Sequence, residues 1–286
     1  MAVYTVGSIN IDHVYRVPHL PFPGETLAAE GYAMGLGGKG ANQSVAASRA
    51  GAKVFHIGAV GPDGAWPLKQ LQGYGVDTVH VVRLEVPTGH AIINVDPQAE
   101  NAIVLFSGAN QQLGESHAAQ ALAGARVGDT LMMQNETSAQ AGAAQIAAAR
   151  GMRVMYSAAP FEVGALRAVL PFATLLLMNE GEATELRQAL GAMPETDMII
   201  TKGAKGAEWI SATTEPLFVP SFRVAPVDTT GAGDCFAGTI AAALDAGSGP
   251  ERAMRRAAAA AAIQVTRPGA AAAMPSRAEV DAFMAQ

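Results

Sequence analysis

Short runs of apolar residues recur along the chain, each of a length typical of a buried strand. They lie at residues 3–7, 54–60, 130–133, 153–156, 174–178 and 198–201. Alanine-rich stretches of helical length separate several of these runs, at 41–50, 138–150 and 235–246. Strands that alternate with helices are typical of βαβ units. The pattern therefore predicts an α/β fold with a mainly parallel central sheet and helices on both faces.

Two regions depart from this alternation of strand and helix. Residues 26–34 have an extended pattern, and residues 88–106 have the pattern of a hairpin with its turn at Asp96, Pro97 and Gln98. Consecutive strands with no helix between them pair antiparallel. We expect one domain, residues 1–286, with a small second sheet built from segments at about 12–34 and 88–107. Such a sheet would expose an apolar face and an open edge, which predicts a homodimer joined through it.

Composition narrows the class of protein. Half of the 286 residues are hydrophobic, 15% are charged, and the formal net charge is -6. An acidic chain is a poor match for nucleic acid or an anionic membrane surface, so we expect neither as a partner. Cys235 is the one cysteine, which excludes an intramolecular disulfide. We recognise no signal peptide or membrane span and expect a cytoplasmic protein.

The segment from Asp228 to Gly238 carries the strongest chemical signal. Its sequence is DTTGAGDCFAG, a glycine-rich turn that leads directly into a helical run. Backbone N–H groups converge in such a turn, and a helix N-terminus adds partial positive charge, so the segment favours phosphate binding. Asp234 lies where that helix begins, and a carboxylate there can accept the proton of an attacking hydroxyl. The alternative, a capping aspartate beside a simple turn, explains less of the string.

A second glycine-rich segment, GLGGKGANQ, runs from Gly35 to Gln43. It contains GxGxxG, but it does not close the first βα unit and has no acidic residue about 20 positions beyond its start, which argues against an NAD enzyme. Gly40 follows the lysine where a Walker A loop has Ser or Thr. We interpret the segment as a loop that approaches a polyhydroxylated ligand, with Asn42 bonding to hydroxyls.

Carboxylates follow two of the expected strands. Asp12 comes shortly after the first strand, in Asn10-Ile11-Asp12, and Glu136 follows another strand. In α/β proteins, ligands gather at the C-terminal ends of parallel strands. Carboxylates accept hydrogen bonds from sugar hydroxyls, so these residues are candidates for a sugar site.

These motifs together resemble the PfkB family of carbohydrate kinases, and ribokinases within it. The likeness also includes Asn179-Glu180-Gly181-Glu182, the TKGAKG string at 201–206 and the VTRPG string at 265–269, so it extends along essentially the whole chain. The resemblance implies a ribokinase-like three-layer sandwich with a small β-sheet lid. It also implies transfer of the γ-phosphoryl group of ATP to a sugar hydroxyl, with D-ribose as the first candidate and ribose 5-phosphate as the product.

The resemblance also implies a role for individual residues. Asp234 would be the catalytic base, with Gly231, Ala232 and Gly233 as the anion hole. The sugar would be held by Asn10, Ile11, Asp12, Gly38, Lys39, Gly40, Ala41, Asn42, Glu136 and Asp234. ATP and Mg²⁺ would be held by Asn179, Glu182, Thr201, Lys202, Gly203, Ala204, Lys205, Gly206, Gly233 and Asp234. A K⁺ site would involve Asp228, Thr230, Gln264, Arg267 and Gly269.

The chain departs from the family pattern at three places. The stretch between Glu182 and Thr201 is short, which predicts a missing helix on the nucleotide side. Ala273 stands where a serine hydroxyl is usual in the cation loop, so we expect weaker K⁺ activation. Ala258 stands where a histidine often contacts adenine.

A nucleoside, another sugar or a sugar acid remains the alternative substrate, since lid residues such as His90 can reshape the pocket. A non-catalytic sensor has no need of Asp234.

Overall fold

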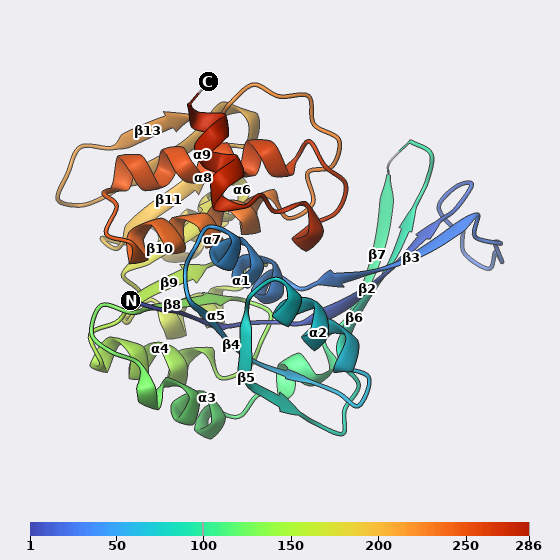
Figure 1. Cartoon of the computed structure of the whole chain (residues 1–286), viewed down its shortest axis with the longest axis horizontal. Helices are drawn as coiled ribbons and strands as arrows, with labels where there is room; N and C mark the ends of the chain where they lie inside the picture. Colours follow the sequence, from blue (N-terminus) through green and yellow to red (C-terminus); the bar gives the residue numbers. More distant parts are fainter. Residues whose placement is uncertain (99, 286) are drawn as a thin grey trace.

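The apolar runs form a nine-stranded sheet at the centre of the molecule (Figure 1). The computed structural model describes residues 1–98 and 100–285. Seven neighbouring strands are parallel, and two antiparallel strands complete one edge. The spatial order is β13 (Leu217–Pro220), β12 (Gly206–Ile210), β11 (Asp197–Thr201), β10 (Leu175–Asn179), β9 (Arg153–Ser157), β8 (Thr130–Gln134), β1 (Val3–Val6), β4 (Val54–Val60) and β5 (Asp77–Arg83). The predicted mainly parallel sheet is confirmed. Strands β5, β12 and β13, at or next to the two edges, are additional to the predicted ones.

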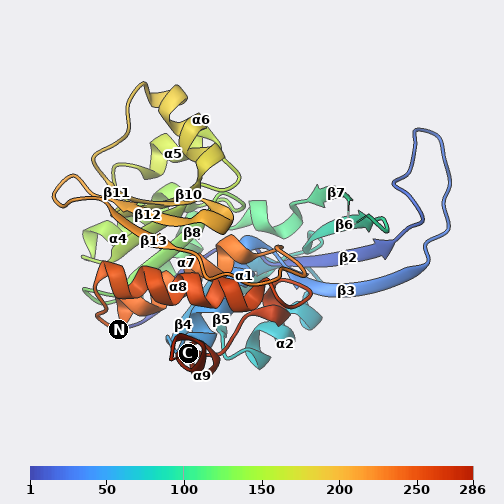
Figure 2. The same cartoon turned by 90° about the horizontal axis from the view of Figure 1, so that it is seen from above.

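Helices cover both faces of this sheet, as Figure 2 shows from above. One core lies under α1 (Lys39–Arg49), α2 (Ala65–Gly73), α7 (Ala232–Asp245), α8 (Pro250–Gln264) and α9 (Arg277–Met284). The other lies under α3 (Glu115–Ala121), α4 (Gln140–Ala149), α5 (Val163–Val169) and α6 (Glu180–Leu190). Short 3₁₀ turns are η1 (Gly108–Gln112), η2 (Leu122–Gly124), η3 (Gly203–Lys205) and η4 (Ala271–Ala273). The predicted three-layer sandwich is confirmed.

Small residues let α1 and α7 approach each other closely. A Cβ added at Gly238 in α7 would lie 2.4 Å from the carbonyl oxygen of Gln43 in α1, so a larger side chain would push the helices apart. Ala46 and Ala47 of α1 lie beside Gly238. Further alanines of the two helices are also buried, including Ala41, Ala237 and Ala241. The close approach brings the first turns of the two helices together, and the candidate site lies there.

A second, four-stranded sheet projects from the core (Figures 1 and 2). Its order is β3 (Gly31–Gly37), β2 (Asn10–Arg16), β6 (Gly89–Val95) and β7 (Asn101–Phe106). The β6–β7 pair is the predicted antiparallel hairpin. The segment expected to be extended at 26–34 is paired only from Gly31 onward. Asn10, Ile11 and Asp12, which we expected just after the first strand, are the first residues of β2.

The C-terminal ends of the parallel strands point toward the first turns of α1 and α7. Gln134, Ser157, Asn179 and Thr201 are the last residues of β8, β9, β10 and β11. Only residues 191–196 separate α6 from β11, so the connection between these two elements contains no helix, in agreement with the short sequence between Glu182 and Thr201. Among the described residues, none of the helices combines the length and the apolarity that crossing a membrane requires.

Candidate active site

Asp234 lies in the first turn of α7, next to a glycine-rich turn. The helix begins at Ala232, and the preceding Gly231 has a φ of 79°, in the left-handed region that glycine adopts readily. Asp234 is 9% exposed, although aspartate is rarely buried without partners. A buried carboxylate in this position must therefore be held by specific hydrogen bonds.

Two amides of α1 hold the Asp234 carboxylate. Asn42 donates from Nδ2 to Oδ2 at 3.1 Å, and Gln43 donates from Nε2 to Oδ1 at 3.0 Å. Gln43 is itself oriented by Gln134 at the end of β8, whose Nε2 donates to Gln43 Oε1 at 2.7 Å. Each oxygen of Asp234 thus has one donor. The carboxylate is fixed in place and retains capacity to accept a further proton or hydrogen bond.

Burial changes the acidity of Asp234. Desolvation raises its pKa to about 6, against the lowering effects of the Lys39 charge and of the Gln43 and Asn42 hydrogen bonds. The group is therefore mostly ionised at neutral pH but has a higher proton affinity than an exposed aspartate. A pKa close to the working pH is what general base catalysis requires. The arrangement can accept a proton from a hydroxyl group.

The turn before Asp234 presents backbone donors. The N–H of Ala232 is bonded to the carbonyl of Thr229 at 3.2 Å, and the helical hydrogen bonds begin with Cys235 N–H to Gly231 O at 2.8 Å. In the described part of the chain, this leaves the N–H groups of Gly233 and Asp234 without a backbone acceptor. Of the three residues expected to form an anion hole, Gly231 and Gly233 have no acceptor for their backbone N–H groups among the described residues, whereas the N–H of Ala232 is already bonded to Thr229. Free N–H groups at a helix N-terminus stabilise negative charge.

Asp12 lies at the base of the projecting sheet, opposite Gly35 of the paired strand β3, and its carboxylate lies over Gly37. A Cβ at Gly37 would lie 2.1 Å from Oδ2 of Asp12, so a larger residue there would displace this carboxylate from its present position. Burial and, to a smaller extent, the nearby charge of Glu136 together raise the pKa of Asp12 to about 6. Two carboxylates close together and partly buried form a strong acceptor for hydroxyl donors.

Glu136 links the end of β8 to the glycine-rich loop. Its Oε2 accepts hydrogen bonds from Ser8 Oγ at 2.5 Å and from the backbone N–H of Lys39 at 2.9 Å. On the other side, Asn110 of η1 donates to Asn10 Oδ1 at 2.7 Å and accepts from the N–H of Ile9 at 3.0 Å. These contacts bring Asn10, Asp12, Glu136 and the loop from Gly38 to Asn42 into one region.

Two adjoining cavities lie beside Asp234. The smaller, of about 190 Å³, is lined by residues that include Lys39, Gln43, Asn179, Glu182 and Asp234. The larger, of about 590 Å³, has a mostly apolar lining that includes the ends of β11 and β12 and the side of α8. They share Thr201, Thr229, Ala232, Gly233 and Phe236. The smaller cavity, next to Asp234, suits a phosphate chain, and the larger, mostly apolar cavity suits the base that follows it.

The larger cavity is lined by half of the residues expected to bind the nucleotide, Gly233 among them. Thr201, Gly203, Ala204 and Gly206 line it, together with Ala258. The two lysines of the same segment point elsewhere. Lys202 forms an ion pair with Glu208 at 2.6 Å, and Lys205 lies 3.7 Å from Glu180.

Asn179 and Glu182 form a capping box at the start of α6. Asn179 Oδ1 accepts from the N–H of Glu182 at 2.9 Å, and Glu182 Oε2 accepts from the N–H of Asn179 at 2.8 Å. Desolvation raises the pKa of Glu182. No group of three or more metal-ligating side chains occurs within residues 1–98 and 100–285. Mg²⁺ in phosphoryl-transfer sites is bound through one or two carboxylates and the phosphates, so Glu182 fits such an ion.

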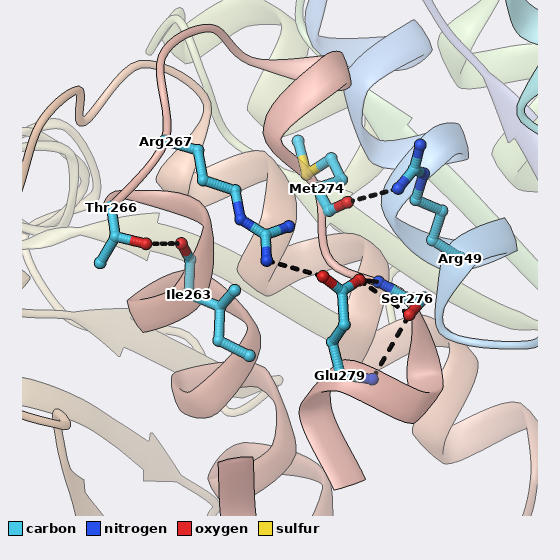
Figure 3. Close-up of polar contacts among 7 residues, drawn as sticks. All are labelled: Arg49, Ile263, Thr266, Arg267, Met274, Ser276 and Glu279. Carbon is cyan, nitrogen blue, oxygen red and sulfur yellow. Dashed lines mark hydrogen bonds and ion pairs between the residues drawn. The ribbon is translucent and has the colours of Figure 1, made fainter. Parts of the chain in front are cut away.

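The residues expected to bind K⁺ form a closed hydrogen-bonded cluster. Asp228 accepts from the N–H groups of Thr230 at 2.9 Å and Gly269 at 2.8 Å. Gln264 donates from Nε2 to the carbonyl oxygens of the same two residues, at 2.7 and 3.1 Å. The side chain of Arg267 points to Glu279, 2.6 Å away (Figure 3). Because an N–H group lies between two oxygens that a cation would share, this cluster does not fit the K⁺ site that the resemblance implies.

Several residues of the site were missed in the sequence analysis. Gln43 and Gln134 orient Asp234, Ser8 positions Glu136, and Asn110 positions Asn10. Gln43 is the last residue of the glycine-rich segment at 35–43, and this position was the only sign in the sequence that it belongs to the site. Ser8, Asn110 and Gln134 act through partners about 90 to 130 positions away in the chain, and no local pattern indicates such contacts.

Comparison with known proteins agrees with this geometry. Residues 2–277 match the model of the pfkB family carbohydrate kinases. The chain is 38% identical over 298 residues to the ribokinase of Haemophilus influenzae, a match that covers 98% of this chain and 97% of that protein. The structure of a ribokinase from Thermotoga maritima has a TM-score of 0.90 at 32% identity, with both chains fully covered. An Arabidopsis thaliana ribokinase complexed with ribose and ATP has a TM-score of 0.87 at 26% identity, over 99% of each chain.

A buried carboxylate beside free N–H groups, next to a cavity of nucleotide size, occurs in a chain whose full length matches sugar kinases. This protein belongs to the pfkB family of carbohydrate kinases.

Proposed function

We propose that this protein transfers the γ-phosphoryl group of ATP to the 5-hydroxyl of D-ribose. The single observation that carries the proposal is the position of Asp234, a buried carboxylate with a pKa of about 6 between the free N–H groups of α7 and the loop at Gly38–Asn42. Relatives named ribokinase, and the Arabidopsis ribokinase complexed with ribose and ATP, support ribose as the acceptor.

In this proposal, Asp234 accepts the proton of the ribose hydroxyl while that oxygen attacks the γ-phosphorus. The bond from the γ-phosphorus to the bridging oxygen breaks, and ADP leaves. Gly233 and Asp234 offer their N–H groups to the charge on the transferring phosphoryl group. Lys39, which lines the same cavity, adds a positive charge near the phosphates. The larger apolar cavity receives the adenine ring, with Ala258 on its wall.

The sugar is assigned to the region between Asp12, Glu136 and Asn42. Asp12 and Glu136 accept hydrogen bonds from ring hydroxyls. Asn42 reaches Asp234 at 3.1 Å and so joins the sugar region to the base. The amide of Asn110 keeps Asn10 oriented for the same ligand.

Mg²⁺ is part of the proposal, and Glu182 would hold it together with the phosphates of ATP. When bound, the ion neutralises charge on the phosphate oxygens. Glu182 and Asn179 keep their capping box, which fixes the carboxylate at the wall of the cavity. K⁺ is left out of the proposal because Gln264 already donates to two of the oxygens that would bind it.

We assign the four-stranded sheet as a lid within one kinase domain, and as the contact between two copies of the chain. Its outer strand β7 leaves Ile103, Val104, Leu105 and Phe106 between 47% and 67% exposed. A run of exposed apolar residues on an edge strand is unusual in a monomer, and a second copy of the same sheet can cover it. Closure of the lid over the sugar would exclude water from the phosphoryl group.

A cytoplasmic location is supported by Cys235 being free and buried.

A substrate panel tests the proposed function. Initial rates of ADP formation with ATP and Mg²⁺ are measured for D-ribose, 2-deoxy-D-ribose, hexoses, sugar acids and nucleosides. The proposal expects kcat/KM for D-ribose to exceed that for every other acceptor by at least about tenfold, the effect of one unpaired polar group in the pocket. Nuclear magnetic resonance of the product should place the phosphate on C5. A higher kcat/KM for a nucleoside, or ADP formation that no sugar stimulates, would contradict it.

A further inference from the structure

Thr230 and Gly269 are each held twice, through both sides of their backbone. Their N–H groups donate to the two oxygens of Asp228, at 2.9 and 2.8 Å. Their carbonyl oxygens accept from one nitrogen, Nε2 of Gln264, at 2.7 and 3.1 Å. A carboxylate and an amide thus join the turn that begins the anion hole to the loop that follows α8. We call these four residues the latch.

Gln264 is well placed to act as the donor of the latch. It is the last residue of α8, and its side chain is completely buried. Its Nε2 lies between two carbonyl oxygens that come from segments 34 and 5 residues away. The amide hydrogens supply the positive end of a dipole at the point where the two negative oxygens converge. A cation bound to both oxygens would have to occupy that same place and would be repelled by those hydrogens.

The charge of Asp228 is satisfied without a cation. Each of its two carboxylate oxygens accepts a backbone N–H, Oδ1 from Thr230 at 2.9 Å and Oδ2 from Gly269 at 2.8 Å. Hydrogen bonds from two backbone donors therefore stabilise the ionised carboxylate. The Ala273 side chain, also buried, provides no hydroxyl to this region.

The loop that carries Gly269 is anchored on both sides of the latch (Figure 3). Before it, Thr266 donates from Oγ1 to the carbonyl of Ile263 at 2.6 Å, and Arg267 pairs with Glu279 at 2.6 Å. After it, Arg49 donates to the carbonyl of Met274 at 2.9 Å. Protein groups alone thus hold the loop at three points besides the latch.

We propose that the side-chain amide of Gln264 takes the place of a monovalent cation and holds the anion-hole turn at Thr230 in its working position. Gln264 is a positioning residue, since it acts through the backbone of Thr230 and does not touch substrate. The chain therefore works at the same rate in K⁺ and in its absence. The part of this inference that concerns rate rests on the proposed function, whereas the part that concerns ion binding does not.

Thermal unfolding without substrates tests ion binding by the latch directly. Tm is measured in potassium chloride and in tetramethylammonium chloride at equal ionic strength, for the unaltered chain, Gln264→Glu and Gln140→Glu. Gln264→Glu keeps the side-chain size but places a third acceptor group beside the two carbonyls, which creates a site for K⁺. Gln140 is the matched control, because it is also buried and donates from Nε2 to a backbone carbonyl, that of Thr137, at 2.7 Å.

The expected result is specific to the position of the substitution. The unaltered chain and Gln140→Glu should have the same Tm in both salts, whereas K⁺ should raise the Tm of Gln264→Glu by about 2–4 °C. A K⁺-dependent rise in the unaltered chain would mean that the amide turns its Oε1 toward the carbonyls and binds the ion, which overturns the inference. A Gln264→Glu variant that responds to K⁺ no more than Gln140→Glu does would overturn it as well.

Rates give the second readout. ADP formation by the unaltered chain should agree within about twofold between the two salts. For Gln264→Glu, kcat should fall by about tenfold or more in tetramethylammonium and recover at least in part in K⁺, because the ion then joins the carbonyls that the amide joined before. A fall that K⁺ leaves unchanged would mean that Gln264 only fills space, and this too overturns the inference. If no sugar supports turnover, the proposed function fails, and the Tm experiment still decides the question of the latch.

Discussion

The Nε2 atom of Gln43 lies 3.0 Å from Oδ1 of Asp234, and the two residues are 191 positions apart in the chain. The contact joins the first turns of α1 and α7, which pack closely because Gly238 has no side chain. Gln134 fixes the rotation of the Gln43 amide, so that its N–H groups face the carboxylate. The helix pairing and the orientation of the proposed base are therefore one structural feature.

The pH dependence of the reaction follows from the acidity of the two buried aspartates. Asp234 and Asp12 both have pKa values of about 6. Asp234 must be ionised to take the proton of the sugar hydroxyl, and Asp12 accepts hydrogen bonds from the sugar more strongly when it is ionised. We expect log kcat/KM for D-ribose to be level above pH 7 and to fall below pH 6 with a slope between one and two. A profile that stays level down to pH 5 would contradict the proposed roles.

Lys39→Met should shift this profile. The positive charge of Lys39 lowers the pKa of Asp234, so its removal should raise that pKa and move the acid limb to higher pH. Lys53→Met is the matched control, since Lys53 lies over the ring of Phe55, away from the two cavities. If the two variants have the same pH profile of kcat/KM, the charge of Lys39 does not affect the pKa of Asp234.

Asp12→Ala should weaken sugar binding selectively. Each hydrogen bond that the sugar loses to an unpaired buried partner costs about 1–3 kcal/mol, so the Kd for ribose should rise by about 5- to 150-fold. The Kd for ATP should stay within about twofold, because Asp12 lines neither of the two cavities beside Asp234. Calorimetric titration of each ligand measures both values. Equal weakening of the two ligands would show that Asp12 supports the fold and not the sugar.

His56 makes the stability of the fold depend on pH. It is fully buried between Ser44 Oγ, 2.9 Å from Nδ1, and the carbonyl of Gly7, 3.1 Å from Nε2. Burial lowers its pKa to about 4, below the unfolded value of 6.5. The unfolded chain therefore binds more protons between pH 6.5 and 4, and the stabilisation present above pH 6.5 is lost as pH falls through 4. The loss is on the order of 3 kcal/mol.

Denaturant unfolding of the unaltered chain and of His56→Gln measures this contribution. Glutamine keeps one donor and one acceptor but does not titrate, so the difference in unfolding free energy between the two proteins should shrink from pH 7 to pH 4. Taking the difference cancels the opposite effect of Asp12 and Asp234, whose raised pKa values destabilise the fold as pH rises through the same range. A difference that is constant with pH would contradict the neutral, buried state of His56.

The proposed dimer contact has a simple test on β7. Val104 is 67% exposed on this edge strand, so Val104→Glu should not disturb the core of a single chain. It should convert a dimer into a monomer in light scattering at micromolar concentration, because it would bury a charge in the contact. Val127→Glu, at another residue that is exposed (81%), is the control and should leave the mass unchanged. A monomeric mass for the unaltered chain, with and without ribose, would end the dimer proposal.

The sequence predicts the layered fold because the apolar runs and alanine-rich helices are long and strongly patterned. The six predicted runs all became strands of the central sheet, and 88–106 became the β6–β7 hairpin. Strands β5, β12 and β13 were not predicted, since they lie at or next to the edges of the sheet: no residue of β5 is fully buried, and only part of β12 and β13 is.

The candidate site was predictable only where a motif carries its chemistry locally. Asp234 and Gly233 belong to such a motif. The latch was not predictable, because the role of Gln264 depends on two carbonyl groups that meet only when the turn before α7 folds against the loop after α8. The K⁺ ion expected at this place was implied by the family resemblance alone. The proposed role of Gln264 in its place follows from the contacts of its amide with the carbonyl groups of Thr230 and Gly269.

The most direct test of the central claim is the turnover of Asp234→Asn with ATP and D-ribose. The variant should fold, because Asn42 Oδ1 has no partner within the described residues and can accept a hydrogen bond from the new amide after rotation. Its Kd for ATP, measured by calorimetry, should stay within about threefold of the unaltered value. The account predicts that kcat falls by about 10²–10⁴-fold, the typical contribution of a positioned general base. A kcat within about fivefold of the unaltered enzyme would contradict it.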